Sequence, residues 1–320
     1  MRITKTLATA VVVLTVLNAA PANATKASGA TISAVNPPLT IIAVTGTNGQ
    51  LYSKKSNEGF RNLGGVVRDA PAVAHSSLTG HTYYVVKSSN SALYVRTDVT
   101  GFTKIGGVCL YSPAVGVFEN RFVVACIGTN HGLYYASGTL GAGNPVVSGW
   151  VYQGGYVTQG PAVFFLGTTT PHFSVVGRDA FPGYAGLNVY SRSAADPPSG
   201  YRLMYLSCLG QPDIIGAPSS YDGYSFFGCR NGGAFVGSPG QLYYEWDGSY
   251  GSAEYQADGV IAGRVGIASA ADNSAAVVYV TGTNGNIYSK QLTSDYDTQP
   301  SGYTLVGCCA LPGVAAATLN

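Results

Sequence analysis

Short runs of β-branched and aromatic residues alternate with glycine- and asparagine-containing turns along most of this chain. Examples of such runs are 41–45, 83–86, 122–125 and 276–280. Runs of this length and composition are typical of β-strands, and Asn-Gly turns supply the positive φ angles that tight hairpins need. No window has the hydrophobic period of an amphipathic helix. The pattern predicts an all-β protein made of short antiparallel strands.

One sequence unit recurs along the chain. The segment Thr45–Lys54 returns almost unchanged as Thr281–Lys290, weaker copies run 88–94 and 128–134, and the copies at 177–190 and 229–243 carry insertions. A period of about 47 residues is typical of repeat architectures such as propellers. The tyrosines that close the six copies are Tyr52, Tyr94, Tyr134, Tyr190, Tyr243 and Tyr288.

The rest of each unit also repeats. A glycine or acidic residue followed by an aromatic residue leads to a small pair, as in Gly101-Phe102 to Gly106-Gly107, and then to a Pro-Ala-Val-like start. These starts are at Pro71, Pro113, Pro161, Pro218, Gly263 and Pro312. Four-stranded units repeated around an axis can bury their faces on one another, so we expect a six-bladed β-propeller. We also expect the C-terminal strand to pair with the N-terminal blade, because the chain starts at a second strand and ends after a first strand.

The motif order Pro-Ala-Val, then Gly-Thr-Asn-Gly-x-Leu-Tyr, then Gly-aromatic-x-x-Leu-Gly-Gly resembles the tectonin-like and Photorhabdus-type β-propeller lectins. The resemblance covers about residues 35–320 and is closest in the first, second and last units. It implies binding of fucosylated or methylated sugars in clefts between blades. Those lectins repeat a tryptophan in the Gly-aromatic segment, whereas this chain has only Trp150 and Trp246, and Trp246 is outside that slot. No complete set of sugar-binding residues therefore carries over from the resemblance.

The first 24 residues have the pattern of a secretory signal peptide. Arg2 and Lys5 precede an apolar run, 7–17, and the segment ends in Ala22-Asn23-Ala24, a small-x-small cleavage pattern. The apolar run is shorter than the roughly 20 residues that cross a bilayer. We expect a secreted, extracellular protein that is not inserted in a membrane, with residues 25–320 forming a single propeller domain.

The low content of charged residues argues against some classes of binding partner. Charged residues make up 10% of the chain, the formal net charge is +2, and the longest basic cluster is the pair Lys54-Lys55. This composition lacks the electrostatic footprint of a protein that binds nucleic acid or an anionic membrane. With 43 glycines and 23 tyrosines, we expect an uncharged, hydroxyl-rich surface instead.

Six cysteines in an exported chain are expected to be paired. Aligned on the repeat, Cys109 and Cys208 precede a first strand, while Cys126 and Cys229 lie near the end of the following second strand. We predict the disulfides Cys109–Cys126 and Cys208–Cys229. The adjacent pair Cys308 and Cys309 has no such partner, so it forms an adjacent-residue disulfide, bridges to another chain or stays free.

Two insertions, 178–186 and 230–240, interrupt the connection between second and third strands in units four and five. In a propeller both would lie on one face and build a raised rim. Side chains that form directional hydrogen bonds to hydroxyl groups gather there, on loops over a rigid scaffold. We regard the rim as a candidate ligand site, with neutral loop variation as the alternative. Its candidate ligand-binding residues are Arg178, Asp179, Tyr184, Arg230, Asn231 and Phe235, with Phe181 beside them.

Aromatic residues that recur in every unit suit packing between blades better than a ligand site. Enzyme signatures are also missing: the four histidines have no metal-type spacing, and neither Gly-x-Ser-x-Gly nor His-Glu-x-x-His occurs. We therefore assign no catalytic residue, metal or cofactor. The leading hypothesis is a secreted carbohydrate-binding protein that uses inter-blade clefts or the rim. An extracellular glycan hydrolase or lyase and a protein-recognition scaffold are the alternatives, and the oligomeric state stays open.

Overall fold

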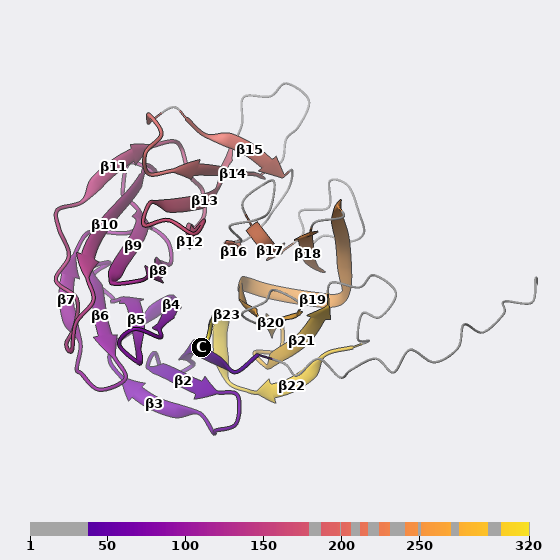
Figure 1. Ribbon diagram of the computed structural model, residues 1–320. Coiled ribbons are helices and arrows are strands. Elements are labelled where there is room, and N and C mark those ends of the chain that lie inside the picture. The colour runs from indigo at the N-terminus through magenta and orange to yellow at the C-terminus, as the bar shows by residue number, and fades with distance from the viewer. Residues whose placement is uncertain are drawn as a thin grey trace, which may run out of the picture. The chain divides into compact units, whose positions relative to one another are not determined.

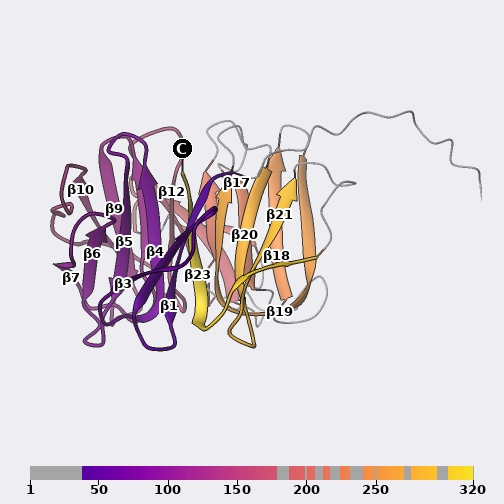
Figure 2. The same cartoon turned by 90° about the horizontal axis from the view of Figure 1, so that it is seen from below.

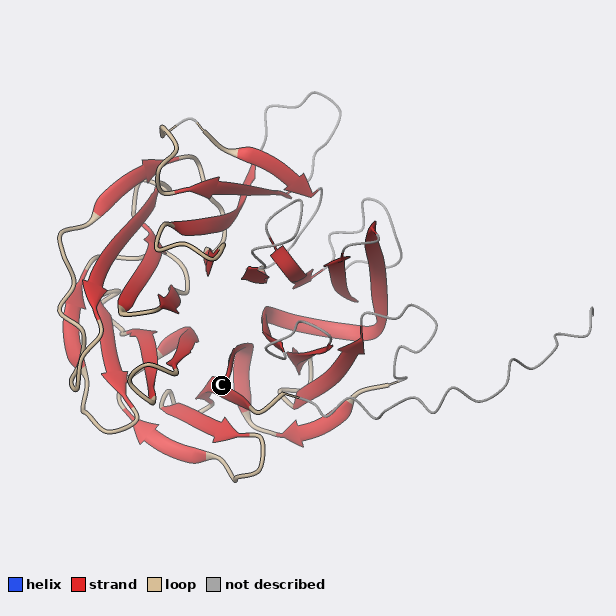
Figure 3. Cartoon of the chain, viewed as in Figure 1, coloured by secondary structure: helices blue, strands red, loops and turns tan. Residues whose placement is uncertain are grey.

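The computed structural model is built from β-strands (Figure 1). It describes residues 38–178, 187–198, 200–205, 212–216, 224–230, 241–248, 251–269, 275–293 and 302–319, all within the unit Val35–Asn320. Every regular element in these residues is a strand (Figure 3), so the all-β prediction is confirmed. None of the described residues forms a helix long and apolar enough to cross a bilayer.

Four sheets have four antiparallel strands each. In the first sheet the order is β23 (Ala310–Thr318), β1 (Thr40–Gly46), β2 (Leu51–Lys55) and β3 (Arg61–Gly64). The second is β4 (Arg68–Ser76), β5 (His81–Lys87), β6 (Leu93–Thr97) and β7 (Thr103–Gly106). The third is β8 (Ala114–Phe118), β9 (Arg121–Ile127), β10 (Leu133–Thr139) and β11 (Val151–Gly154). The fourth is β12 (Ala162–Phe165), β13 (Pro171–Arg178), β14 (Leu187–Ser193) and β15 (Arg202–Tyr205).

The remaining strands form one seven-stranded sheet. Its order is β16 (Asp213–Gly216), β17 (Tyr224–Arg230), β18 (Gln241–Gly248), β19 (Gly251–Ser269), β20 (Ala275–Gly282), β21 (Ile287–Thr293) and β22 (Thr304–Gly307). The long strand β19 joins two repeats: it pairs with β18 as far as Val260 and with β20 from Ile261 onward. The structure thus has five sheets, and the prediction of six is wrong in this count. Strand pairing continues through the link between the fifth and sixth repeats, although Gly259 and Gly263 within it have positive φ angles.

The predicted start of the fifth repeat is also wrong. Its first strand, β16, begins at Asp213, directly after Pro212, and pairs with β17. Pro218 follows this strand and lies outside the described residues. Two prolines of similar context, six residues apart, allowed either alignment from the sequence.

The innermost strands contact one another in chain order around the centre of Figure 1. β4 packs against β23 and β8, β12 packs against β8 and β16, and β19 packs against β16 and β23. β23 is hydrogen-bonded to β1, with Thr318 opposite Thr40 and Val314 opposite Val44. Apolar side chains fill the space between neighbouring sheets, as where Tyr83 meets Phe122 at 5.9 Å between ring centroids.

One charged side chain joins sheets near the centre. Arg264 in β19 is only 7% exposed, and its Nη1 donates to the carbonyl oxygens of Pro71 at 3.3 Å and Pro113 at 3.1 Å. Pro71 lies in β4 and Pro113 directly precedes β8, so this arginine ties the seven-stranded sheet to the second and third sheets. In other units an alanine follows the proline at this position, as at Ala72 and Ala114.

Glycine and an aromatic ring form the joint between successive units. A Cβ added at Gly65 would lie 2.6 Å from Cε2 of Phe102, in the next sheet. The same contact joins Gly107 to Trp150, Gly155 to Tyr201 and, across the chain ends, Gly307 to Phe60. The prediction that these recurring aromatic residues pack between units is confirmed.

A cation from the same sheet as the aromatic residue completes most of these joints. The Arg96 guanidinium lies 5.2 Å from the Phe102 ring centroid, and that of Arg192 lies 4.9 Å from the Tyr201 ring centroid. Both arginines also donate a hydrogen bond to a backbone carbonyl of the preceding sheet, at Leu63 and Gln153 respectively. These cations therefore stabilise the joint between units.

Two disulfides are described. Cys109 and Cys126 are bonded, with 5.8 Å between their Cα atoms, as predicted. Cys308 and Cys309 form the adjacent-residue disulfide, the first of the three alternatives. Cys229 lies in β17 and Cys208 lies outside the described residues, so the second predicted pairing stays a prediction.

The turns gather at two opposite ends of the strands, which Figure 2 shows from the side. We call the end with the turns 46–51, 88–92, 128–132 and 282–286 the asparagine face, because each turn contains an asparagine. The end with the turns 76–81 and 97–103 is the opposite face. The disulfide Cys308–Cys309 belongs to the asparagine face, where the carbonyl of Cys309 accepts a hydrogen bond from the Thr47 amide at 3.1 Å.

Candidate functional site

Three turns of the asparagine face, 46–51, 128–132 and 282–286, share a hydrogen-bonded arrangement. The Asn284 side-chain oxygen accepts from the amide of Asn286 at 3.0 Å, and its Nδ2 donates to the hydroxyl of Tyr288 at 3.0 Å. Asn48 makes the same contact to Tyr52 at 2.9 Å. Asn130 makes it to Tyr134 at 3.0 Å. In each case the asparagine both shapes the turn and fixes the tyrosine hydroxyl.

A glycine at the start of three of these turns makes room for the tyrosine, whereas the turn 88–92 has Ser88 in its place. A Cβ added at Gly282 would lie 2.9 Å from Cε2 of Tyr288, and the corresponding distances are 2.6 Å at Gly46 and 2.7 Å at Gly128. Any larger residue would push the ring away from the turn. The local sequence Gly-Thr-Asn therefore decides where the tyrosine hydroxyl is placed.

A cleft of about 240 Å³ opens at the Tyr288 turn. We call it the Tyr288 cleft; the residues that matter most in its lining are Val260, Val280, Thr283, Asn284, Tyr288 and Tyr303. Val260 belongs to the fifth repeat and the others to the sixth, so the cleft lies between two repeats that share β19. Its walls combine aromatic rings, aliphatic carbons, an amide and hydroxyl groups, and none of its lining residues is charged.

The two tyrosines give the Tyr288 cleft its shape and polarity. Their rings lie edge to face, with centroids 6.3 Å apart. The Tyr288 hydroxyl accepts from Asn284 and, at 3.4 Å, from Asn286, and these two hydrogen bonds lower the pKa of Tyr288. With its acceptor positions occupied, this hydroxyl is left to donate its proton. A ring beside a proton donor and amide groups is suited to a sugar, whose faces carry C–H groups and whose edges carry hydroxyls.

Counterparts of this arrangement recur along the asparagine face. An apolar residue follows the joint glycines in four units and is unusually exposed: Val66 is 66% exposed, Val108 56%, Tyr156 57% and Val260 50%. Cys309 of the adjacent disulfide has the corresponding place in the last unit. The units differ in detail, since Tyr156 stacks on His131 with ring centroids 4.6 Å apart.

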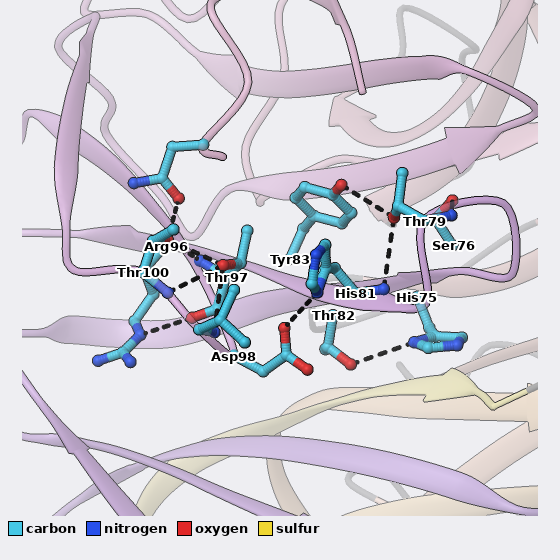
Figure 4. A network of polar contacts seen from close by, with 12 residues as sticks. His75, Ser76, Thr79, His81, Thr82, Tyr83, Arg96, Thr97, Asp98 and Thr100 are labelled. Atoms are coloured by element: carbon cyan, nitrogen blue, oxygen red, sulfur yellow. Dashed lines mark hydrogen bonds and ion pairs between the residues drawn. The ribbon is translucent and has the colours of Figure 1, made fainter. Parts of the chain in front are cut away.

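A second polar cluster lies on the opposite face, in the second sheet (Figure 4). His81 pairs with Asp98 at 3.2 Å, and Nδ1 of His75 lies 3.2 Å from the Thr82 hydroxyl. Burial lowers the pKa of His75. Further hydroxyls of the cluster bond to one another, as Thr79 does to Tyr83 at 3.1 Å.

This cluster fastens turns together. Asn144 reaches it from the connection between β10 and β11 and donates to the Gly101 carbonyl at 2.7 Å and to the Thr103 hydroxyl at 2.8 Å. The hydroxyl groups of the cluster form hydrogen bonds that hold the two turns of the second sheet to the third sheet. We therefore interpret the cluster as structural. Among the described residues, no three histidine, cysteine, aspartate or glutamate side chains gather as metal ligands would.

The rim predicted from the two insertions lies largely outside the described residues. Arg178 is the last residue of β13 and Arg230 the last of β17, so the insertions do fall between second and third strands. Asp179, Tyr184, Asn231 and Phe235 lie outside the described residues. The rim remains a predicted ligand site.

Sequence reasoning did not select the repeated tyrosines as site residues, because it favoured a packing role for them over a ligand site. The signal that could have revealed them is the spacing Asn-x-x-x-Tyr, which recurs as Asn48 and Tyr52, Asn90 and Tyr94, Asn130 and Tyr134, and Asn284 and Tyr288. A packing role does not need an asparagine at that distance.

Solved structures share this fold at very low sequence identity. AofleA from Arthrobotrys oligospora aligns with a TM-score of 0.53 and 8% identity, over 88% of this chain and 90% of that protein. A variant of the lectin AAL from Aleuria aurantia, solved with Fucα1-6GlcNAc, aligns with a TM-score of 0.53 and 10% identity, over 82% and 89%. TolB from Acinetobacter baumannii aligns with a TM-score of 0.53 and 10% identity, over 88% of this chain and 66% of TolB.

The chain has a β-propeller fold. No protein-family model matches the sequence, and no curated protein does. The propeller predicted from the repeats is thus confirmed as a fold, and the neighbours include a lectin solved with a fucosylated sugar. At identities of 8–10% the likeness concerns the fold, because one fold carries many unrelated functions.

Proposed function

We propose that this protein is a secreted carbohydrate-binding protein that holds neutral sugars, fucosides among them, in the Tyr288 cleft and its counterparts on the asparagine face. The observation that carries the proposal is the composition of the cleft: two tyrosine rings, an oriented hydroxyl and an amide between successive repeats. Sites of this kind are shallow and weak one by one. Several on one molecule would gain strength by avidity on a multivalent glycan.

The finer architecture belongs to the same proposal. The two halves of β19 pair with different strands, which supports the assignment of two sequence repeats to the seven-stranded sheet. Pairing of β23 with β1 and the contact of Gly307 with Phe60 support closure between the last and first repeats. The motif resemblance to tectonin-like and Photorhabdus-type lectins and the signal-like first 24 residues support an exported lectin.

Calorimetric titration of the full mature chain with Fucα1-6GlcNAc and a panel of neutral monosaccharides tests the function. We expect saturable binding with more than one site. Tyr288→Ala should lower the affinity of its cleft about tenfold, because an aromatic contact of roughly 0.5–1.5 kcal/mol and its buried area are lost. Asn284→Ala should have a smaller effect, because the ring stays while the hydroxyl is released.

The control is Leu78→Ala, which removes an apolar side chain, 65% exposed, from the opposite face. It should leave sugar binding unchanged. If sugars bind but Tyr288→Ala does not weaken them, the assigned cleft is wrong while the function stands. If no glycan on a broad array binds in a saturable and competed manner, the function itself is refuted.

A further inference from the structure

A larger cleft lies on the opposite face, between the first sheet and the strands β20, β21 and β22. Its volume is about 430 Å³, within the range of roughly 300–1,000 Å³ typical of small-molecule sites. We call it the lysine cleft; the lining residues that matter here are Thr40, Lys54, Lys55, Ser56, Tyr279 and Leu305. Thr40 begins β1 and Lys55 ends β2, which places this cleft at the other end of the strands from the Asn48 turn.

Hydroxyl groups form its inner wall. The Thr40 hydroxyl lies 2.6 Å from the Tyr279 hydroxyl and 2.8 Å from the Ser56 hydroxyl. Burial raises the pKa of Tyr279, so its hydroxyl keeps its proton over the ordinary pH range. This wall joins strands β1 and β20 of different sheets and gives the cleft a defined, neutral, hydrogen-bonding surface.

The two lysines supply the only charge among the lining residues. Nζ of Lys54 donates to the Glu58 carbonyl at 2.6 Å and lies 5.7 Å from the Phe60 ring centroid, and both contacts hold the ammonium in place. Lys55 is exposed. The ion pairs found among the described residues are His81 with Asp98 and Lys87 with Asp69, so no described carboxylate neutralises either lysine of the cleft.

Apolar carbon completes the lining. Leu305 is 60% exposed and Leu39, which also lines the cleft, is 55% exposed. Apolar faces, hydroxyls and a double positive charge without a paired acid together suit a ligand with C–H surface, hydroxyl groups and an anionic substituent. The Tyr288 cleft, by contrast, has no charged lining residue.

We propose that the lysine cleft binds an acidic sugar, which carries either a carboxylate or a sulfate ester, at a site separate from the neutral-sugar clefts. This proposal rests on the proposed function for the choice of a sugar as ligand. The anionic substituent is not part of the proposed function. It gives the lysine cleft a ligand specificity that the asparagine face lacks. A lysine ammonium acts as a point charge and accommodates either anion. The experiment therefore has to distinguish a carboxylated sugar from a sulfated one.

Titration with galacturonic acid and with its methyl ester tests the charge alone, because the ester keeps the ring and all ring hydroxyls. We expect the acid to bind and the ester to bind at least tenfold more weakly. The affinity of the acid should fall as sodium chloride is raised, whereas that of the ester should not. Galactose 6-sulfate in the same titration shows whether sulfate or carboxylate is preferred; either preference agrees with the proposal.

The double variant Lys54→Gln/Lys55→Gln should weaken binding of the acid about tenfold or more, since exposed ion pairs contribute roughly two- to fivefold each and Lys54 is held in place. Lys104→Gln is the control, because it removes one positive charge from an exposed position in β7, outside the lysine cleft. It should leave binding of the acid unchanged.

Three results would overturn the proposal: equal binding of acid and ester, full binding by the double variant, or equal loss in the Lys104→Gln control. Retained binding of Fucα1-6GlcNAc and a cooperative thermal unfolding transition show that the double variant is folded. If the wild-type protein does not bind the fucoside but binds galacturonic acid through the lysines, the assignment of the Tyr288 cleft as a sugar site is wrong. The proposal for the lysine cleft then still holds.

Discussion

Substitution of the adjacent glycines Gly64 and Gly65 separates two contributions to the free energy of unfolding. One is the strain of a left-handed backbone, and the other is the steric overlap of a Cβ with a neighbouring ring. Both glycines have a left-handed backbone, with φ of 74° and 83°. A Cβ at Gly64 would meet no atom within 4 Å, whereas a Cβ at Gly65 would lie 2.6 Å from Cε2 and 2.9 Å from Cζ of Phe102. Alanine at position 64 therefore tests the strain of the backbone conformation alone. Alanine at position 65 tests that strain together with the steric overlap at the joint between units.

The expected magnitudes follow from these two geometries. Alanine in a left-handed conformation costs roughly 1–2 kcal/mol, and the stiffer unfolded chain returns about 0.4–1 kcal/mol. Gly64→Ala should therefore lower the free energy of unfolding by about 1 kcal/mol. Gly65→Ala should cost about 1–3 kcal/mol more, as overpacked cores do, because the Phe102 ring is also held by Arg96.

Urea denaturation of the two single variants, followed by tyrosine and tryptophan fluorescence, measures the difference. Gly59→Ala is the control, since this glycine has neither a left-handed φ nor an atom within 4 Å of its added Cβ. In a Phe102→Ala background, Gly65→Ala should cost no more than Gly64→Ala does, because the ring is gone. Equal losses for Gly64→Ala and Gly65→Ala in the wild-type background would refute the joint between units as described.

Two further predictions concern buried polar groups. Arg264→Met should lower the free energy of unfolding by about 2–4 kcal/mol, because the hydrogen bonds to the Pro71 and Pro113 carbonyls are lost at a buried position; a variant as stable as the wild type in urea would contradict this role. Burial raises the pKa of Tyr84 and of Tyr201 to about 12, so the unfolded chain, where tyrosine titrates near pH 10, loses these protons first. Stability should be constant in this respect below about pH 10 and fall toward pH 12, and a flat profile of urea midpoints between those values would count against it.

Much of the fold could be predicted from the sequence because its determinants are local. Positions of strands and turns follow from β-branched runs and Asn-Gly turns, and the repeat revealed the propeller. The pairing of Cys109 with Cys126 followed from aligning one unit on another. Each of these depends on residues within about 50 positions of one another, which a single repeat contains.

The count of sheets and the location of clefts depended on contacts between units. Whether the backbone breaks or continues between Val260 and Ile261 is decided by pairing with two different partner strands, β18 and β20. The lysine cleft brings together residues near both ends of the chain, Lys54 and Leu305 among them.

The sequence by itself thus determined the strands, the repeat and the glycines and aromatic residues that recur in it, since each arises from short-range sterics and hydrophobicity. Only the tertiary structure decided which repeats are in contact, which carbonyl groups accept hydrogen bonds from Arg264, and which side chains line the same cleft. The physical reason is that the same apolar face can pack on many surfaces, and only the full set of contacts between sheets selects one.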